Sequence, residues 1–223
     1  MKNLFESVLL LLCALLTHAQ AQAAIVTFDN MPTNTYSTQV GRALYGPNRS
    51  GVGSPSTIQG MQFTASTSGY LSSILAPMTT ATFWGQVANV QLSLWSDAGN
   101  SPLSLISSSS LQVGPVSPSP ILSWNWGGTS FLQQGQKYWI TAQTNTSNAI
   151  VSWQYVPTYL STTALTASTN SGQSNWTVFN GNGGEMAMRV MVTPVPEPEI
   201  FAMLLSGLGL LGWMGKRRQR AFQ

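Results

Sequence analysis

Few side chains in this 223-residue sequence could carry out acid–base or nucleophilic chemistry. The single cysteine and the single histidine, Cys13 and His18, both lie close to the N-terminus. Serine-triad, thiol and zinc–histidine chemistries require a thiolate or an imidazole, so the body of the chain excludes them. Between residues 24 and 195 the carboxylates are Asp29, Asp97 and Glu185. Two of them could in principle form a glycosidase pair, but Asp97 stands in a turn sequence, and we expect no catalytic residue.

Oxygen ligands alone could hold calcium. Asp97 with Asn100, or Asn180 and Asn182 with Glu185, would supply a loose site of this kind. Neither segment has the dense acidic run that is typical of a calcium-binding loop, so solvated turns are the favoured interpretation. We therefore expect no bound metal and no cofactor.

The first 23 residues predict a cleaved secretory signal peptide. Lys2 precedes an apolar stretch over residues 8–16, and small residues follow, with cleavage options after Ala21 or Ala23. The apolar stretch is shorter than the roughly 20 residues that cross a bilayer. Leu12 precedes the cysteine where a lipoprotein would have a small residue, so lipidation is not expected. We expect export by the Sec translocon and removal of the segment, with its cysteine and histidine, by signal peptidase.

The positive charge of the sequence is concentrated at its C-terminus. The formal net charge is +3, with nine cations in all. Four of these nine lie in the last eight residues: Lys216, Arg217, Arg218 and Arg220. Residues 24–195 hold four cations and three carboxylates, a net charge of 4 − 3 = +1. A nearly neutral body lacks the basic surface on which nucleic-acid binding depends, so we expect no nucleic-acid partner.

Polar and apolar residues alternate in short segments throughout the body. These segments are residues 61–65, 90–95, 138–143, 150–156 and 186–192. A period of two indicates half-buried strands, and Gly- or Pro-rich breaks at 97–102, 114–120 and 180–184 end them. No helical period is long enough to predict a helix between residues 24 and 195. The sequence predicts one antiparallel β-sandwich domain of jelly-roll type over residues 24–193.

Tryptophans are the most distinctive binding residues of the body. Of the eight tryptophans, all but Trp213 lie between residues 24 and 195. Large aromatic residues usually fill a sandwich core. Trp95 and Trp139, however, alternate with aliphatic residues that would face inward, which predicts that both indoles face outward. Exposed rings beside Ser, Thr, Asn and Gln could stack on sugars, and the candidates for polysaccharide binding are Trp95, Trp139, Trp124 and Trp126.

The C-terminal 30 residues combine three features in order. The first is a short proline motif made of Val195, Pro196, Glu197 and Pro198. An apolar run over residues 200–215 and a basic tail over residues 216–220 follow it. As a helix the apolar run would measure roughly 24 Å, short against a hydrocarbon core of about 30 Å, so flanking cations would have to snorkel. The basic tail predicts a cytoplasmic C-terminus, and a plain membrane anchor is the alternative interpretation.

This arrangement resembles the PEP-CTERM sorting signal of exported proteins in Gram-negative bacteria that make exopolysaccharide. The resemblance covers residues 194–223. It implies recognition by an exosortase, a membrane protease-transpeptidase that cuts near the Pro-Glu-Pro. It also implies that the chain is held in the inner membrane transiently and then reaches the cell surface or the extracellular matrix.

The body resembles choice-of-anchor domains, which are β-rich extracellular modules found with various C-terminal anchoring signals. The residues that carry this resemblance are 61–64, Leu71 with Ile74, 90–102 and 132–139. Together the two resemblances predict a non-catalytic structural or adhesive protein associated with exopolysaccharide or biofilm. A carbohydrate-binding module that uses exposed tryptophans is the alternative, and a carboxylate-dependent hydrolase is a remote one.

Overall fold

The structure is a computed structural model of the whole chain. It describes residues 23–31, 34, 36, 41–48, 56–80, 87–115, 120–156, 164–170, 175–180, 184–195 and 206–209. The predicted signal peptide, apart from Ala23, lies outside these residues. So does most of the predicted hydrophobic helix 200–215, of which residues 206–209 form a helical turn. Among the described residues, no helix is long and apolar enough to cross a membrane.

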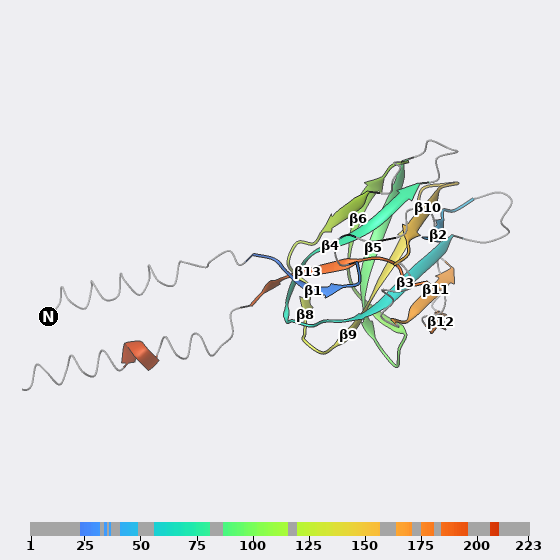
Figure 1. Cartoon of the computed structure of the whole chain (residues 1–223). Coiled ribbons are helices and arrows are strands. Elements are labelled where there is room, and N and C mark those ends of the chain that lie inside the picture. The colour runs from blue at the N-terminus through green and yellow to red at the C-terminus, as the bar shows by residue number, and fades with distance from the viewer. Residues whose placement is uncertain are drawn as a thin grey trace, which may run out of the picture.

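Two antiparallel sheets make up the body (Figure 1). The six-stranded sheet has the order β12 (Thr177–Phe179), β11 (Thr166–Asn170), β3 (Thr57–Thr64), β9 (Lys137–Thr144), β5 (Ala88–Asp97) and β6 (Pro102–Val113). The seven-stranded sheet has the order β1 (Ile25–Asp29), β13 (Arg189–Pro194), β4 (Gly69–Thr80), β10 (Ile150–Gln154) and β2 (Gly41–Tyr45). In that sheet β7 (Ile121–Asn125) and β8 (Phe131–Leu132) also pair with β4. The two sheets confirm the prediction of an antiparallel β-sandwich.

The core lies between the sheets and is built from alternate residues of each strand. Leu71, Ile74 and Met78 of β4 and Leu92 and Leu94 of β5 are fully buried in it. Successive strand residues point to opposite faces, so Gln91 and Ser93, which flank Leu92 in β5, face away from the core.

Two buried tryptophans of this core, Trp153 and Trp124, donate their indole N–H groups to backbone carbonyls. Trp153 of β10 donates its indole N–H to the Ala187 carbonyl at 2.9 Å. Trp124 of β7 donates to the Val90 carbonyl of the opposite sheet at 3.2 Å. A buried N–H without a partner costs about 1–3 kcal/mol, so these bonds let the large rings fill the core.

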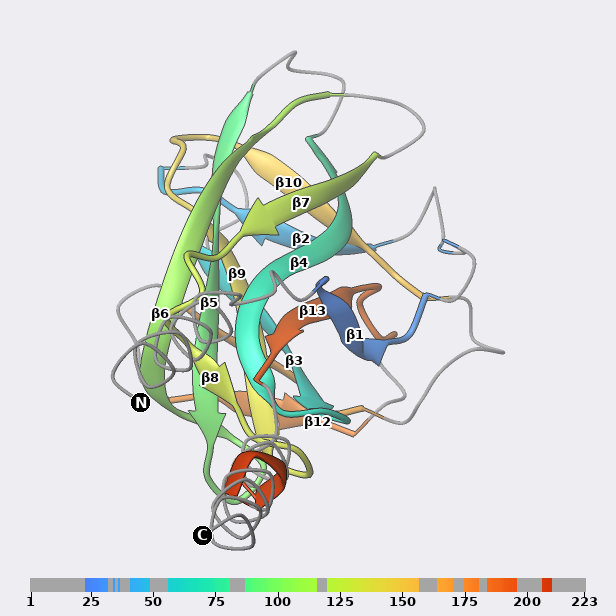
Figure 2. The ribbon, with the colours of Figure 1, turned by 90° about the vertical axis from the view of Figure 1, so that its left-hand side faces the viewer.

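The two ends of the body meet in one sheet. β1 pairs with β13, with Ile25 opposite Val192. Asn30 strengthens this junction because its buried amide accepts from Met188 N at 2.8 Å and donates to the Met186 carbonyl at 3.0 Å. The start of β1 and the end of β13 therefore lie on the same side of the body, as Figure 1 shows and as Figure 2 shows from that side.

Candidate functional site

The outer face of the six-stranded sheet gathers the polar and aromatic side chains that the core does not use. Gln62 of β3, Trp139 of β9 and Trp95 of β5 are successive cross-strand neighbours on this face. Thr141 lies two residues beyond Trp139 on the same face and is buried. We call this set, together with Asp97 and Trp176, the outer-face cluster.

Asp97 holds the cluster together. Its Oδ1 accepts a hydrogen bond from the indole N–H of Trp139 at 2.7 Å and another from the Gln62 side-chain amide at 2.7 Å. Charge-assisted bonds of this length are about twice as strong as neutral ones. The carboxylate therefore fixes both side chains against the sheet.

The β5–β6 hairpin positions Asp97. Gly99 and Asn100 have φ values of +60° and +67°, the left-handed region that Gly and Asn adopt most readily. Ala98 and Ser101 exchange backbone hydrogen bonds, and the backbone N–H of Asn100 donates to Asp97 Oδ2 at 3.4 Å. The turn-forming role predicted for Asp97 is thus confirmed, and the same side chain also reaches across the sheet.

Lys137 and Gln62 occupy the oxygens that the calcium alternative would use. The Lys137 ammonium donates to Asn100 Oδ1 at 3.0 Å, and the Gln62 amide reaches the same oxygen at 3.3 Å. Within the described residues, no group of three or more His, Cys, Asp or Glu side chains is placed to hold a metal. Of the second calcium alternative, Asn182 lies outside the described residues.

Trp139 faces outward, as its position in the strand predicted, but the expectation that its ring is exposed is wrong. Its exposed fraction is 0 %. Its cross-strand neighbours Gln62 and Trp95 flank the ring on either side, and Asp97 binds its N–H. An outward direction in a strand therefore does not guarantee exposure.

Trp124 and Trp126 are also buried, contrary to the expectation of sugar-stacking rings. Trp124 pairs with Ile74 of β4 and points into the core with it. Trp126 is 7 % exposed and donates its N–H to Ser107 Oγ of β6 at 2.8 Å. Both rings share the core-facing parity, whereas the intervening Asn125 is exposed.

Trp95 and Trp176 form the accessible aromatic part of the cluster. Trp95 is half-buried and donates its N–H to Thr141 Oγ1 at 2.9 Å. Trp176, also half-buried, comes from the segment just before β12 and meets Trp95 edge to face, with ring centroids 5.9 Å apart. The sequence analysis did not select Trp176, although it has the same parity as Val178, opposite the exposed Thr177 and Phe179.

A small cavity lies on the same sheet, at its β11–β12 edge. It measures about 340 Å³. Its lining residues carry only hydroxyl and amide side chains and are Thr57, Ser168, Thr169, Asn170, Asn175 and Thr177. Such a lining offers hydrogen bonds without charge.

The other carboxylates of the body stabilise the fold in different places. Asp29 forms an ion pair with Arg189 at 2.9 Å, joining β1 to β13. Glu185 is 2 % exposed and accepts a hydrogen bond from the backbone N–H of Ala164 at 2.7 Å. Asp97, Asp29 and Glu185 each therefore hold a separate structural contact.

The proposed sorting residues lie at the margin of the described structure. Val195 follows β13 directly and is 42 % exposed, and Ala23 precedes β1 and is exposed. The rest of the motif, the signal cleavage residue Ala21 and the basic cluster at 216–220 lie outside the described residues.

Residues 194–218 match the family model of the PEP-CTERM protein-sorting motif. A comparison with curated proteins finds none that matches the chain. This match covers only the C-terminal segment and does not include residues 24–193 of the body. The motif indicates an exported protein that an exosortase sorts to the cell surface.

Proposed function

We propose that this chain is a non-catalytic surface or extracellular-matrix protein whose β-sandwich acts as a structural or adhesive unit alongside exopolysaccharide in a biofilm. The observation that carries the proposal is the position of the sorting motif. The matched segment begins at Pro194, the last residue of β13, so a processing enzyme meets the motif at the edge of a complete domain. Cutting there would release the whole body.

The chemistry of the body supports a non-catalytic role. Asp97, Asp29 and Glu185 are each bound to structural donors rather than gathered in one site. The residues between 24 and 195 also contain no cysteine or histidine. The same proposal includes the idea that the body is a module similar to choice-of-anchor domains.

The proposal includes a membrane step. The apolar run 200–215 would sit in the inner membrane after the Sec translocon and signal peptidase have acted, with the basic tail in the cytoplasm. The exosortase would then remove this tail, leaving the body at the cell surface or in the matrix.

Intact-mass measurement of the extracellular protein, with and without the exosortase, tests this function. We expect the mature protein to lack residues 1–23 and everything beyond the Pro-Glu-Pro region when the exosortase is present. Replacing Pro196 and Pro198 together with alanine should block processing, whereas Pro47→Ala in a body loop should not. Retention of residues 200–223 in the extracellular wild-type protein would contradict sorting.

A carbohydrate-binding module is the second candidate, because Trp95 and Trp176 remain partly accessible. On the same outer face, two rows away from Trp95, lie the amide side chains of Gln91 and Gln143, which hydrogen-bond each other at 2.6 Å. Aromatic rings beside neutral hydrogen-bonding groups suit the apolar faces and hydroxyls of sugars.

Pull-down on the organism's own extracellular polysaccharide tests this second candidate. The double variant Trp95→Ala/Trp176→Ala should weaken binding at least roughly tenfold, which corresponds to a loss of about 1.4 kcal/mol of binding free energy. Trp95→Phe, which keeps a ring, should retain more binding, and Phe179→Ala, at another exposed ring, should have no effect. Unchanged binding of the double variant, or no binding of the wild type, would eliminate the tryptophan site.

A further inference from the structure

Exposed apolar side chains gather at the end of the sandwich from which both termini leave. Ile25 and Val26 begin β1, Tyr70 is the second residue of β4, Phe131 begins β8, and Val195 follows β13. Each of the five is 38–46 % exposed. We call this set the terminal collar.

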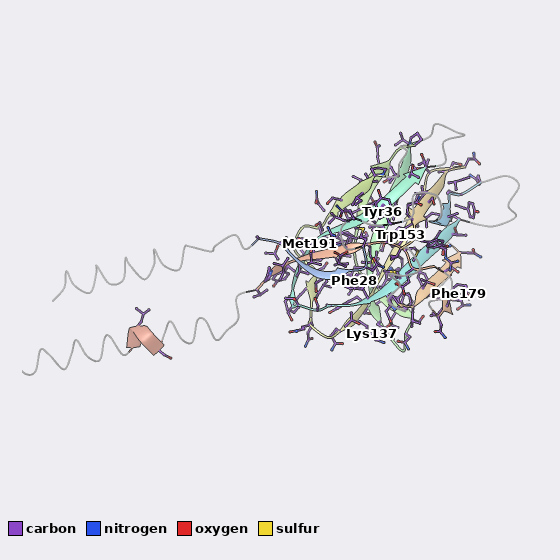
Figure 3. All side chains as sticks on the ribbon, viewed as in Figure 1. Phe28, Tyr36, Lys137, Trp153, Phe179 and Met191 are labelled. Atoms are coloured by element: carbon purple, nitrogen blue, oxygen red, sulfur yellow. The ribbon has the colours of Figure 1, made fainter. Side chains whose placement is uncertain are left out.

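Strand register brings the collar residues together. Tyr70 lies between Thr193 of β13 and Phe131 of β8, and its ring meets the Phe131 ring edge to face at 5.4 Å. Ile25 lies opposite Val192, close to the end of β13. Figure 1 places β1, β8 and β13 at this end, and Figure 3 places Met191, the partner of Val26, there as well.

The strands that carry the collar have almost no charge. β4 and β8 contain no charged residue. The charges of β1 and β13 are Asp29 and Arg189, which pair with each other at the opposite ends of these strands. Apolar and aromatic side chains without nearby strand charges are typical of a surface that enters the boundary of a lipid bilayer.

The segment between the collar and the apolar run is short enough to keep the collar close to a membrane that holds the run. Four residues lie between Val195 and Ile200, where the apolar run begins, so these two residues are at most about 18 Å apart at 3.3–3.6 Å per residue step. The headgroup layer on each side of a bilayer is roughly 5–7 Å thick. If the apolar run lies in the bilayer, Val195 must lie within about 18 Å of the hydrocarbon.

We propose that the terminal collar docks the folded body onto the outer surface of the membrane before processing, with Tyr70 and Phe131 at the lipid headgroup boundary. This inference rests on the membrane step of the proposed function. Docking holds the Pro-Glu-Pro segment beside the bilayer, where a membrane-embedded protease acts. It also adds apolar contact to a membrane segment that is short for the hydrocarbon thickness.

Fluorescence quenching in vesicles tests the collar on residues 24–223, the chain that signal peptidase would leave. These residues contain no cysteine, so a bimane probe is attached at Thr129→Cys, close to Phe131. The protein is reconstituted in phosphatidylcholine–phosphatidylglycerol vesicles that contain phosphatidylcholine brominated near the headgroup. We expect strong quenching, and we expect Tyr70→Ser with Phe131→Ser to lower the docked population at least about fivefold, a loss of about 1 kcal/mol. Val26→Ser should lower it less.

Val87 supplies the matched control position. It is 53 % exposed and directly precedes β5. The first residue of β5, Ala88, pairs with Val113. The next residue, Gly114, accepts a backbone hydrogen bond from Thr80, at the end of β4 that is far from the collar. Thr80 is ten residues from Tyr70 along β4, which corresponds to about 33 Å at 3.3 Å per strand residue. A probe at Val87→Cys should stay unquenched, and Val87→Ser should leave the quenching at Thr129 unchanged.

The outcomes separate this inference from the proposed function. If the chain floats with the vesicles but both probes are quenched equally, collar docking is overturned and the membrane step is not. The same holds if the Tyr70→Ser/Phe131→Ser variant shows no loss of quenching. A probe that responds to protein concentration but not to brominated lipid assigns the collar to self-association and overturns lipid docking. A chain that does not float with the vesicles overturns the membrane step together with the inference.

Discussion

Replacing Asp97 with alanine should destabilise the body through Trp139. The substitution removes the acceptor of two 2.7 Å hydrogen bonds, one from the Trp139 indole and one from the Gln62 amide. Trp139 is fully buried, so its N–H would lose a charged partner where water cannot replace it. Gln62 keeps a second acceptor, Asn100 Oδ1 at 3.3 Å, and loses less.

The magnitude follows from these two bonds. A hydrogen bond to a charged group contributes about 1.5–3 kcal/mol, and a neutral one about 1 kcal/mol. We therefore expect Asp97→Ala to lower the free energy of unfolding by about 3 kcal/mol. Asp97→Asn keeps an oxygen acceptor of the same shape, and we expect it to cost only about 1 kcal/mol.

Urea unfolding of the exported protein, followed by tryptophan emission, measures these differences. Trp139→Phe removes the donor, so Asp97→Ala should cost about 1.5–3 kcal/mol less in that background than in the wild type. A loss below about 0.5 kcal/mol for Asp97→Ala, or strict additivity of the two substitutions, would refute the role assigned to this bond.

Three further substitutions test other parts of the fold, each by the same unfolding assay. Asn30→Ala should cost about 3 kcal/mol, because it leaves two buried backbone groups without partners. Gly184→Ala should cost about 2 kcal/mol or more, since this residue has a φ of +82° and an added Cβ would lie 2.8 Å from the Tyr155 ring. Asp29→Asn should cost less than about 1 kcal/mol, and the loss should shrink in high salt, because its ion pair with Arg189 is partly exposed (22 % and 21 %).

Alternation predicted five of the strands, β3, β5, β9, β10 and β13, and which of their residues face the core, because alternation is a local property. Val90, Leu92 and Leu94 face the core, and Trp95 faces away from it, as their spacing indicates. The burial of Trp139 was beyond such reasoning, because its neighbours come from strands distant in the sequence and are brought beside it by the register of β3, β5 and β9.

The misassigned tryptophans show a second limit. Trp124 and Trp126 alternate with polar residues. This pattern shows that the two rings share one face of the strand, but it does not show whether that face points into the core or to the solvent. Pairing with β4 decides this, since Trp124 lies opposite the buried Ile74. The terminal collar could not be predicted from the sequence either, because Tyr70 and Phe131 become neighbours only when β4 and β8 pair.

The pairing of β1 with β13 sets the time at which the sheet can close. β1 is the first strand to be synthesised, but its partner is the last, and at about 5–20 residues per second the chain between them takes roughly 8–30 s to make. Until then β4 lacks its β13 neighbour and β1 lacks the strand that it pairs with. A prematurely terminated chain therefore lacks both the closing strand and the sorting motif that follows it, so every chain that carries the sorting motif also carries the strand that completes the sheet.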